Sequence, residues 1–323
     1  MREATPAEAA LRPTAAARLS RLVRRRPRML LVFSVVYLAA VFGVMLWRGV
    51  EIEPEWVVLA LLLIAVATGR GIQFLKDWAP FLVLFIAYEA MSGFASQTGF
   101  RPMDTGRLEL ALFHGTLPTV WLQSRLYSTT RISPLDWATM CAYFLHFVIP
   151  LLVGFVFWMR SRALYWRFIS ALMLLSFLAF LTYLFFPSAP PWYQFPHEVH
   201  KVIDATIRKW GVSYYVSPVF SHLNPNQFAA FPSLHASYPV LCAIYAWRLN
   251  RRFSIGLFAW SAFVWFSIVY LGEHYVVDAL ASLAYIAVTV VSLELVLRRW
   301  PRLLPGSEHE GATAPVPAHA RGG

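Results

Sequence analysis

Apolar and polar residues are arranged in long blocks along the chain, and eight blocks are strongly apolar. A run of about 20 apolar residues can cross the hydrocarbon core of a bilayer as a helix. The pattern therefore predicts an all-α fold, a polytopic transmembrane helical bundle of about eight spans. The second and sixth blocks are short, so their ends are the least well defined. The expected spans are 29–47, 56–68, 78–94, 137–159, 164–186, 234–247, 254–271 and 276–297.

The composition agrees with this pattern, because 58% of the 323 residues are hydrophobic and only 14% are charged. Such a composition is typical of a membrane protein. The net charge of +11 comes largely from arginines in short clusters between the apolar blocks. That distribution favours membrane topology over nucleic-acid binding, so we expect no nucleic-acid partner.

The basic clusters also orient the bundle. They lie before the first expected span and after the second, fourth, sixth and eighth. Since cytoplasmic loops carry an excess of Lys and Arg, we expect a multi-pass protein of the cell membrane with both termini in the cytoplasm. The long segments 95–136 and 187–233, and the turn "GEHY", then fall on the extracytoplasmic side.

Three regions follow from this organisation. Residues 1–28 form a basic cytoplasmic tail before an uncleaved anchor, and residues 29–300 form the transmembrane domain. Residues 301–323 have the Pro, Gly and Ala content of a disordered cytoplasmic tail. Cys141 and Cys242 lie inside apolar runs, which indicates packing instead of a disulfide.

Two short motifs bring polar groups to the extracytoplasmic side. "AAFPSLHASYPV" carries His235, and "GEHYVVDAL" carries His274 and Asp278. The latter two are four residues apart and so share one face of a helix. Ser233 is placed to cap the helix that begins after it, and the amino end of that helix can hold a phosphate group.

The surrounding loops supply candidates for contact with a lipid headgroup. "FFPSAPPWYQF" contains three prolines, which predicts a stiff wall at Pro190 with an aromatic edge at Trp192. His222 and Asn226 precede the sixth expected span and are further candidates. His146 and Glu89 either line a cavity or pack inside the bundle. We expect Glu273, next to His274, to be a solvated neighbour.

"AAFPSLHAS" and "GEHYVVD" resemble the second and third signature motifs of the type 2 phosphatidic acid phosphatase superfamily. "FPSAPPWY" is similar to its inositolphosphotransferase branch, which includes inositol phosphorylceramide synthases. The resemblance covers roughly residues 136–284, with a weaker echo in "LFHGTLPTVWLQ". It implies a six-helix phosphatase-like core preceded by amino-terminal helices. It also implies that His274 is the nucleophile, Asp278 its orienting partner and His235 the general acid.

The sequence departs from the phosphatase members of this superfamily at two cationic positions. Ile268 stands where they carry an arginine, and Phe94 stands where their first motif carries a lysine; only Arg101 with the following proline matches that motif. These departures favour the transferase branch. The cation that binds phosphate is left open among Arg101, Arg107, Arg125 and Lys201, and we take Arg101 and Asn226 as candidate substrate-binding residues with Ser233, Pro190 and Trp192.

The chemistry expected of these groups is attack by the His274 imidazole on phosphorus, with Asp278 holding its other ring N–H. His235 protonates the departing oxygen, and water or an alcohol then breaks the phosphohistidine. No cofactor is expected, and the absence of an "HExxH" pattern or a cysteine cluster makes a zinc site unexpected.

We therefore expect a metal-independent enzyme that transfers a headgroup from a phospholipid or polyprenyl phosphate, possible acceptors including inositol. A lipid phosphate phosphatase acting on phosphatidic acid or a polyprenyl phosphate is the alternative. A proton-coupled transporter using His146, Glu89 and His235 is a remote third.

Overall fold

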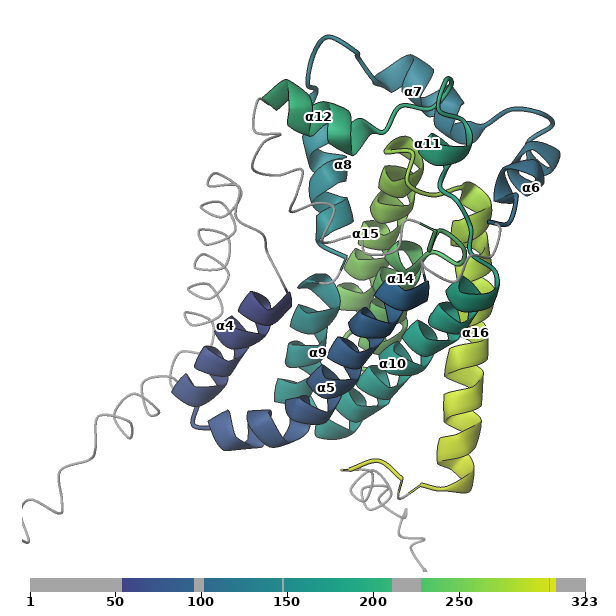
Figure 1. Ribbon diagram of the computed structural model, residues 1–323. Coiled ribbons are helices and arrows are strands. Elements are labelled where there is room, and N and C mark those ends of the chain that lie inside the picture. The colour runs from purple at the N-terminus through teal and green to yellow at the C-terminus, as the bar shows by residue number, and fades with distance from the viewer. Residues whose placement is uncertain (1–53, 96–101, 147, 211–227, 302, 306–323) are drawn as a thin grey trace, which may run out of the picture. The chain divides into compact units, whose positions relative to one another are not determined.

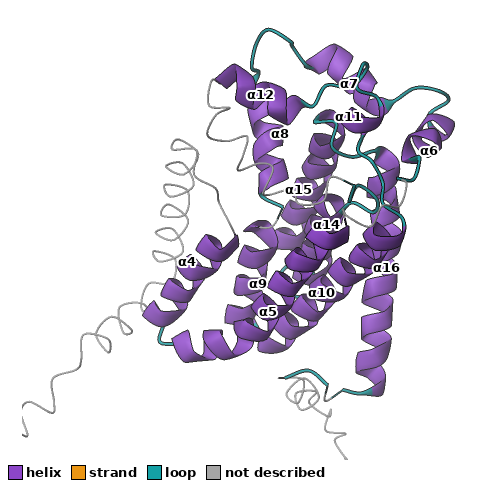
Figure 2. Cartoon of the chain, in the orientation of Figure 1, coloured by secondary structure: helices purple, strands orange, loops and turns teal. Residues whose placement is uncertain are grey.

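The computed structural model describes residues 54–95, 102–146, 148–210, 228–301 and 303–305 (Figure 1). The described residues form helices joined by loops, with no strand among them (Figure 2). The first expected span, the basic tail and almost all of the expected carboxy-terminal tail lie outside these ranges.

Each of the other seven expected spans coincides with a helix or a pair of helices, which confirms the all-α class. Three helices are long and apolar enough to cross a membrane, namely α10 (Arg162–Phe185), α15 (Arg251–Tyr270) and α16 (Val276–Arg299). A fourth crossing results if α8 (Pro134–Phe144) and α9 (Val148–Arg160) count as one bent span. The apolar helix α14 (Leu234–Ala246) is shorter. The total of eight spans stays a prediction.

Two compact units divide the chain, residues 1–87 with 210–224, and residues 88–209 with 225–323. The first unit contains α4 (Pro54–Ala67) and most of α5 (Gly71–Ala95). Buried aromatic rings follow one side of α5, where Phe74 stacks on Trp78 at a centroid distance of 4.8 Å. The second unit contains His235, His274 and Asp278.

Helix α14 is the central element of the second unit, because it contacts α15, α16, α10 and α9. Alanines at positions 236, 243 and 246 are fully buried on α14 and allow neighbouring backbones to approach closely. The start of α14 is also tied to α16, since the Ser282 hydroxyl donates to the Ser233 carbonyl at 2.7 Å and the Ser233 N–H donates to the Asp278 carbonyl at 3.3 Å. The two helices that carry the signature motifs therefore begin side by side.

Four short helices gather at the end of the second unit where α15 meets α16 (Figure 1). They are α6 (Thr105–Leu112), α7 (Pro118–Leu126), α11 (Pro191–Gln194) and α12 (Val202–Trp210). Gln123 of α7 joins two of the segments there, because its side-chain amide donates to the carbonyls of His200 and Tyr270 and accepts from the His200 N–H. The two long loops are thus folded onto the turn that carries His274.

Candidate active site

The turn between α15 and α16 presents His274. Gly272 in this turn has φ +80°, and a Cβ there would lie 2.9 Å from the His200 carbonyl oxygen. Both the backbone conformation and the space therefore require glycine. The His274 N–H donates to the Ile268 carbonyl at 3.2 Å, which places the histidine just before α16 begins.

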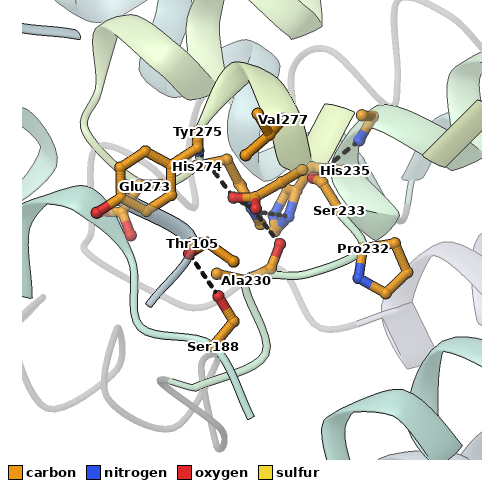
Figure 3. A network of polar contacts seen from close by, with 12 residues as sticks. Thr105, Ser188, Ala230, Pro232, Ser233, His235, Glu273, His274, Tyr275 and Val277 are labelled. Carbon is orange, nitrogen blue, oxygen red and sulfur yellow. Dashed lines mark hydrogen bonds and ion pairs between the residues drawn. The ribbon is translucent and has the colours of Figure 1, made fainter. Parts of the chain in front are cut away.

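The hydrogen bonds of the His274 ring define its tautomer (Figure 3). Nδ1 lies 3.0 Å from the Ala230 carbonyl oxygen and 3.6 Å from Asp278 Oδ2. Because a carbonyl oxygen can only accept, Nδ1 carries the hydrogen and Nε2 carries the lone pair. Nε2 faces His235 Nδ1 at 3.2 Å. The atom with nucleophilic character therefore points at the second motif histidine.

His235 lies in the first turn of α14. Ser233 caps this helix as predicted, its Oγ accepting from the Ala236 N–H at 3.2 Å. Since His274 Nε2 is an acceptor, His235 Nδ1 is the donor between the two rings. His235 Nε2 is buried and has no hydrogen-bond partner among the described residues. Ser233 is fully buried, and its contact with substrate stays a prediction.

Asp278 has two tasks at the start of α16. Its Oδ2 accepts from the Tyr275 N–H at 2.8 Å and also faces the His274 ring. The predicted pairing at i and i+4 is present, but the Ala230 carbonyl is nearer to the ring nitrogen. Sequence reasoning missed Ala230 because any residue type supplies a backbone carbonyl.

The Ala230 carbonyl is held by a small ladder of three distant segments. Isolated parallel bridges join Met103 to Ser188 and Ser188 to Ala229. The Ala230 N–H donates to the Ser188 carbonyl at 3.3 Å, and the hydroxyls of Ser188 and Thr105 are 2.9 Å apart (Figure 3). The two outer loops and the "AAFPSLHAS" motif thus jointly orient His274.

Glu109 of α6 is a second residue that sequence reasoning missed. Its side chain is fully buried, and its two oxygens accept from the N–H groups of Val276 and Val277, each at 3.0 Å. Burial raises the pKa of the Glu109 carboxyl above its ordinary value. Asp278 accepts from the Tyr275 N–H, so carboxylate oxygens accept hydrogen bonds from three successive backbone N–H groups at the start of α16. This helix end is therefore filled by the protein's own acidic groups.

The expectation for Glu273 was wrong. Its side chain is only 4% exposed, and Oε2 accepts from the Trp192 indole N–H at 3.1 Å. Burial raises the pKa of Glu273 to about 7, while the charges of Lys201 and His274 act in the opposite direction. The outer loops fold over this position, which a solvated-neighbour interpretation could not anticipate.

The predicted aromatic wall packs against the His274 turn. Pro190 is buried and precedes α11. The backbone N–H of Trp192 donates to the Gly272 carbonyl at 3.2 Å. The Trp192 ring packs on a cluster of Leu117, Val199 and Tyr275. Headgroup contact by Pro190 and Trp192 stays a prediction. Arg101, His222 and Asn226 lie outside the described residues, as does the side chain of Glu89.

The other candidate cations differ in their surroundings. Arg107 forms an exposed ion pair with Asp104 at 2.7 Å, and the Arg125 guanidinium stacks 4.1 Å from the Trp121 ring centroid. Lys201 Nζ lies 4.3 Å from the Trp192 ring centroid. Of these three, Lys201 is therefore the one joined through Trp192 to the His274 turn. Among the described residues, no cluster of three His, Cys, Asp or Glu side chains could hold a metal ion.

A family comparison agrees with the arrangement of the two motifs. The family model of the PAP2 superfamily matches residues 114–292, a region that contains α14, α15 and most of α16. This match covers more than half of the chain. The chain belongs to the PAP2 superfamily.

Two similar proteins are named as synthases of inositol-containing sphingolipids. The chain is 27% identical over 150 residues to a phosphoinositol dihydroceramide synthase from Bacteroides thetaiotaomicron, covering 42% of this chain and 48% of that one. It is 27% identical over 179 residues to an inositol phosphorylceramide synthase from Candida albicans, covering 52% and 37%. The chain thus spans less than half the length of these relatives. No solved structure matches it.

Proposed function

We propose that this protein is an integral-membrane phosphotransferase that acts on a lipid phosphate or phosphodiester headgroup through a phosphohistidine intermediate. The observation that carries the proposal is the facing pair of His274 Nε2, which bears a lone pair, and His235 Nδ1, which bears a proton, at 3.2 Å. The names of the similar synthases support an inositolphosphotransferase-like activity.

In the first step, His274 Nε2 attacks phosphorus while the bond from phosphorus to the lipid oxygen breaks. His235, entering as imidazolium, gives its Nδ1 proton to that oxygen, which would otherwise leave as an alkoxide. The Ala230 carbonyl and the Asp278 carboxylate stabilise the positive charge that develops on the His274 ring. The products are the lipid alcohol, a phosphohistidine and a neutral His235.

In the second step, the hydroxyl of an acceptor alcohol, such as the ceramide in the names of the similar synthases, attacks the same phosphorus. Neutral His235 takes the proton of that hydroxyl as the bond from phosphorus to Nε2 breaks, which restores the starting state. We place the non-reacting phosphoryl oxygens at the start of α14, because carboxylates already occupy the first amides of α16.

A lipid phosphate phosphatase would use the same groups with water as the acceptor. Ile268 bears on this alternative, because phosphatase members carry an arginine there. Here the side chain is apolar and fully buried, and the position contributes a backbone carbonyl to the His274 N–H. The transferase is therefore the better supported function.

Product analysis tests the proposal. Purified protein is incubated with labelled phospholipids and polyprenyl phosphates, with and without inositol or ceramide as the acceptor. A transferase forms a new phosphodiester, whereas release of inorganic phosphate alone supports the phosphatase. An acid-labile, alkali-stable label on the protein, present in the wild type and absent from His274→Ala, would identify the phosphohistidine.

We also propose that the site faces the extracytoplasmic side. Single cysteines at His197 and Arg252, both exposed in the structure, report the two ends of the bundle. In a background without Cys141 and Cys242, an impermeant thiol reagent should label the first position in intact cells and spare the second. The reverse pattern would place the chemistry in the cytoplasmic leaflet.

A further inference from the structure

A break interrupts the segment that was expected to be one continuous span over 137–159. Helix α8 ends at Phe144, α9 begins at Val148, and their axes differ by 53°. A break inside a membrane leaves backbone groups without their helical partners, so it persists where other groups satisfy them or where it lines a site. At this break, His146 Nδ1 lies 2.9 Å from the Tyr143 carbonyl oxygen, to which it donates.

The break brings two rings against His235. The Tyr143 ring stacks on the His235 ring with centroids 4.1 Å apart and planes inclined by 19°. The His146 ring lies 3.8 Å from the same ring, inclined by 39°. Among the described residues, His274 is the one hydrogen-bond partner of the His235 ring. Apart from that one hydrogen bond, these two ring contacts orient His235 within its site.

Ring contacts suit a group that must change its charge. In the proposed reaction, His235 is imidazolium before the first step and neutral before the second. A carboxylate partner would favour the imidazolium throughout, and a carbonyl partner would commit one nitrogen to a fixed proton. A ring face makes neither demand, and the face of Tyr143 attracts the cation when it forms.

We infer that Tyr143 and His146 are positioning residues that aim His235 Nδ1 at the reacting centre and keep the ring free to carry either charge. The inference rests on the proposed function, because it concerns the general acid of that reaction. It adds two residues that the signature motifs do not contain.

The test compares two substrates that differ only in the leaving group. A natural lipid leaves as an alkoxide and needs a proton, whereas a nitrophenyl ester of the same headgroup leaves without one. Tyr143→Leu and His146→Ala should each lower kcat/KM on the lipid by about 3- to 10-fold, the scale of one aromatic contact. Both should leave kcat/KM for the nitrophenyl ester within about twofold of the wild type, below that scale.

Matched variants separate positioning from a general weakening of the fold. Tyr143→Phe and His146→Phe retain a ring and should keep the wild-type ratio between the two substrates. In a His235→Ala background, Tyr143→Leu and His146→Ala should cause no further loss on the lipid, since the group that they position is gone. Thermal unfolding of each variant in detergent shows whether it is folded.

Two outcomes would overturn the inference alone. The first is an equal loss on both substrates in a folded variant, and the second is a further loss of several fold in the His235→Ala background. If the wild-type protein transferred or hydrolysed no headgroup, the proposed function itself would fail and the inference with it. These results are distinguishable, because the first two require an active wild type.

Discussion

The two motif histidines face each other but are held in different ways. A backbone carbonyl at 3.0 Å and a carboxylate at 3.6 Å hold His274, both acting on Nδ1. His235 donates from Nδ1 to His274 Nε2 and is otherwise held by two rings, with centroids 4.1 and 3.8 Å away. The acceptors on Nδ1 select one tautomer of His274, whereas the ring contacts of His235 do not themselves fix a proton on either of its nitrogens. The arrangement suits a nucleophile that needs a constant lone pair and an acid that must gain and lose a proton.

The helices at these histidines also begin differently, His235 lying in α14 and His274 directly preceding α16. Helix α14 is capped by its own Ser233, a local interaction that its sequence predicts. Helix α16 is capped by Asp278 from within and by Glu109 from 167 residues away. The helix that follows His274 therefore depends on a distant outer segment.

The largest expected effect is that of His274→Ala. The variant removes the atom that bonds to phosphorus, so turnover should fall by about 10⁵-fold or more, the scale of nucleophile loss in covalent enzymes. Turnover is measured with both the lipid and its nitrophenyl analogue. Recovery of the variant on the nitrophenyl ester would show that His274 is not the nucleophile.

Asp278→Asn should have a smaller effect than His274→Ala and a larger one than His235→Ala. The variant weakens the stabilisation of charge on His274 and disturbs the cap on Tyr275, while the Ala230 carbonyl still holds Nδ1. We expect a loss on both substrates, because the nucleophile is affected and not the leaving group. Steady-state kinetics with the two substrates measures it, and loss confined to the lipid would contradict the assigned role.

His235→Ala should lower kcat/KM for the natural lipid by about 10²- to 10⁴-fold, the usual contribution of a general acid. The loss of kcat/KM on the nitrophenyl ester should be much smaller, because kcat/KM does not include the second step, in which His235 acts as the base. The ratio of the two losses is the measurement that distinguishes the histidines. If the ratio of the loss on the lipid to the loss on the nitrophenyl ester were the same for His235→Ala and His274→Ala, the two histidines would not have different roles.

Glu109→Gln tests the distant cap. Glutamine keeps one acceptor but turns an amide NH₂ toward the N–H groups of α16, so stability should fall by about 1–3 kcal/mol. Because His274 directly precedes α16 and Asp278 lies in its first turn, kcat should fall by about tenfold on both substrates, which corresponds to about 1.4 kcal/mol at the transition state. The exposed Glu198→Gln is the matched control. A variant as stable and active as the control would remove Glu109 from the scaffold of the site.

Glu273 should affect stability more than turnover. Its pKa of about 7 in the folded protein lies above the ordinary value of 4.5, so its contribution is complete below pH 4.5 and is lost as the pH rises through 7. Glu273→Gln keeps an acceptor for Trp192 and should remove this dependence, worth about 3 kcal/mol. Thermal unfolding from pH 4.5 to 8 measures it. Parallel curves for variant and wild type would contradict the burial of an ionisable group here.

Much of the fold could be predicted because membrane helices are encoded locally. The apolar runs identify α10, α15 and α16 within a few residues, since each run must match the bilayer by itself. The short outer helices α6 and α12 could not be identified, because they are stabilised by the segments that they contact and are not long apolar runs.

The site shows the same division between local and distant information. The spacing of His274 and Asp278 and the cap at Ser233 are local and could be predicted. Glu109 and the Ala230 carbonyl act across 167 and 44 residues, so nothing in their own sequence neighbourhood marks them. The break after Phe144 was missed because both sides of it are apolar.

The long sequence separation between Glu109 and the N–H groups that it binds has a consequence for the synthesis of the protein. The ribosome synthesises α6 well before the first turn of α16, and at ~5–20 residues per second the 167 intervening residues take roughly 10–30 s. During that interval the buried carboxylate lacks the amides that it binds in the finished protein. Helix α6 therefore completes its packing only after the start of α16 has been synthesised. The nascent protein has no complete site before then.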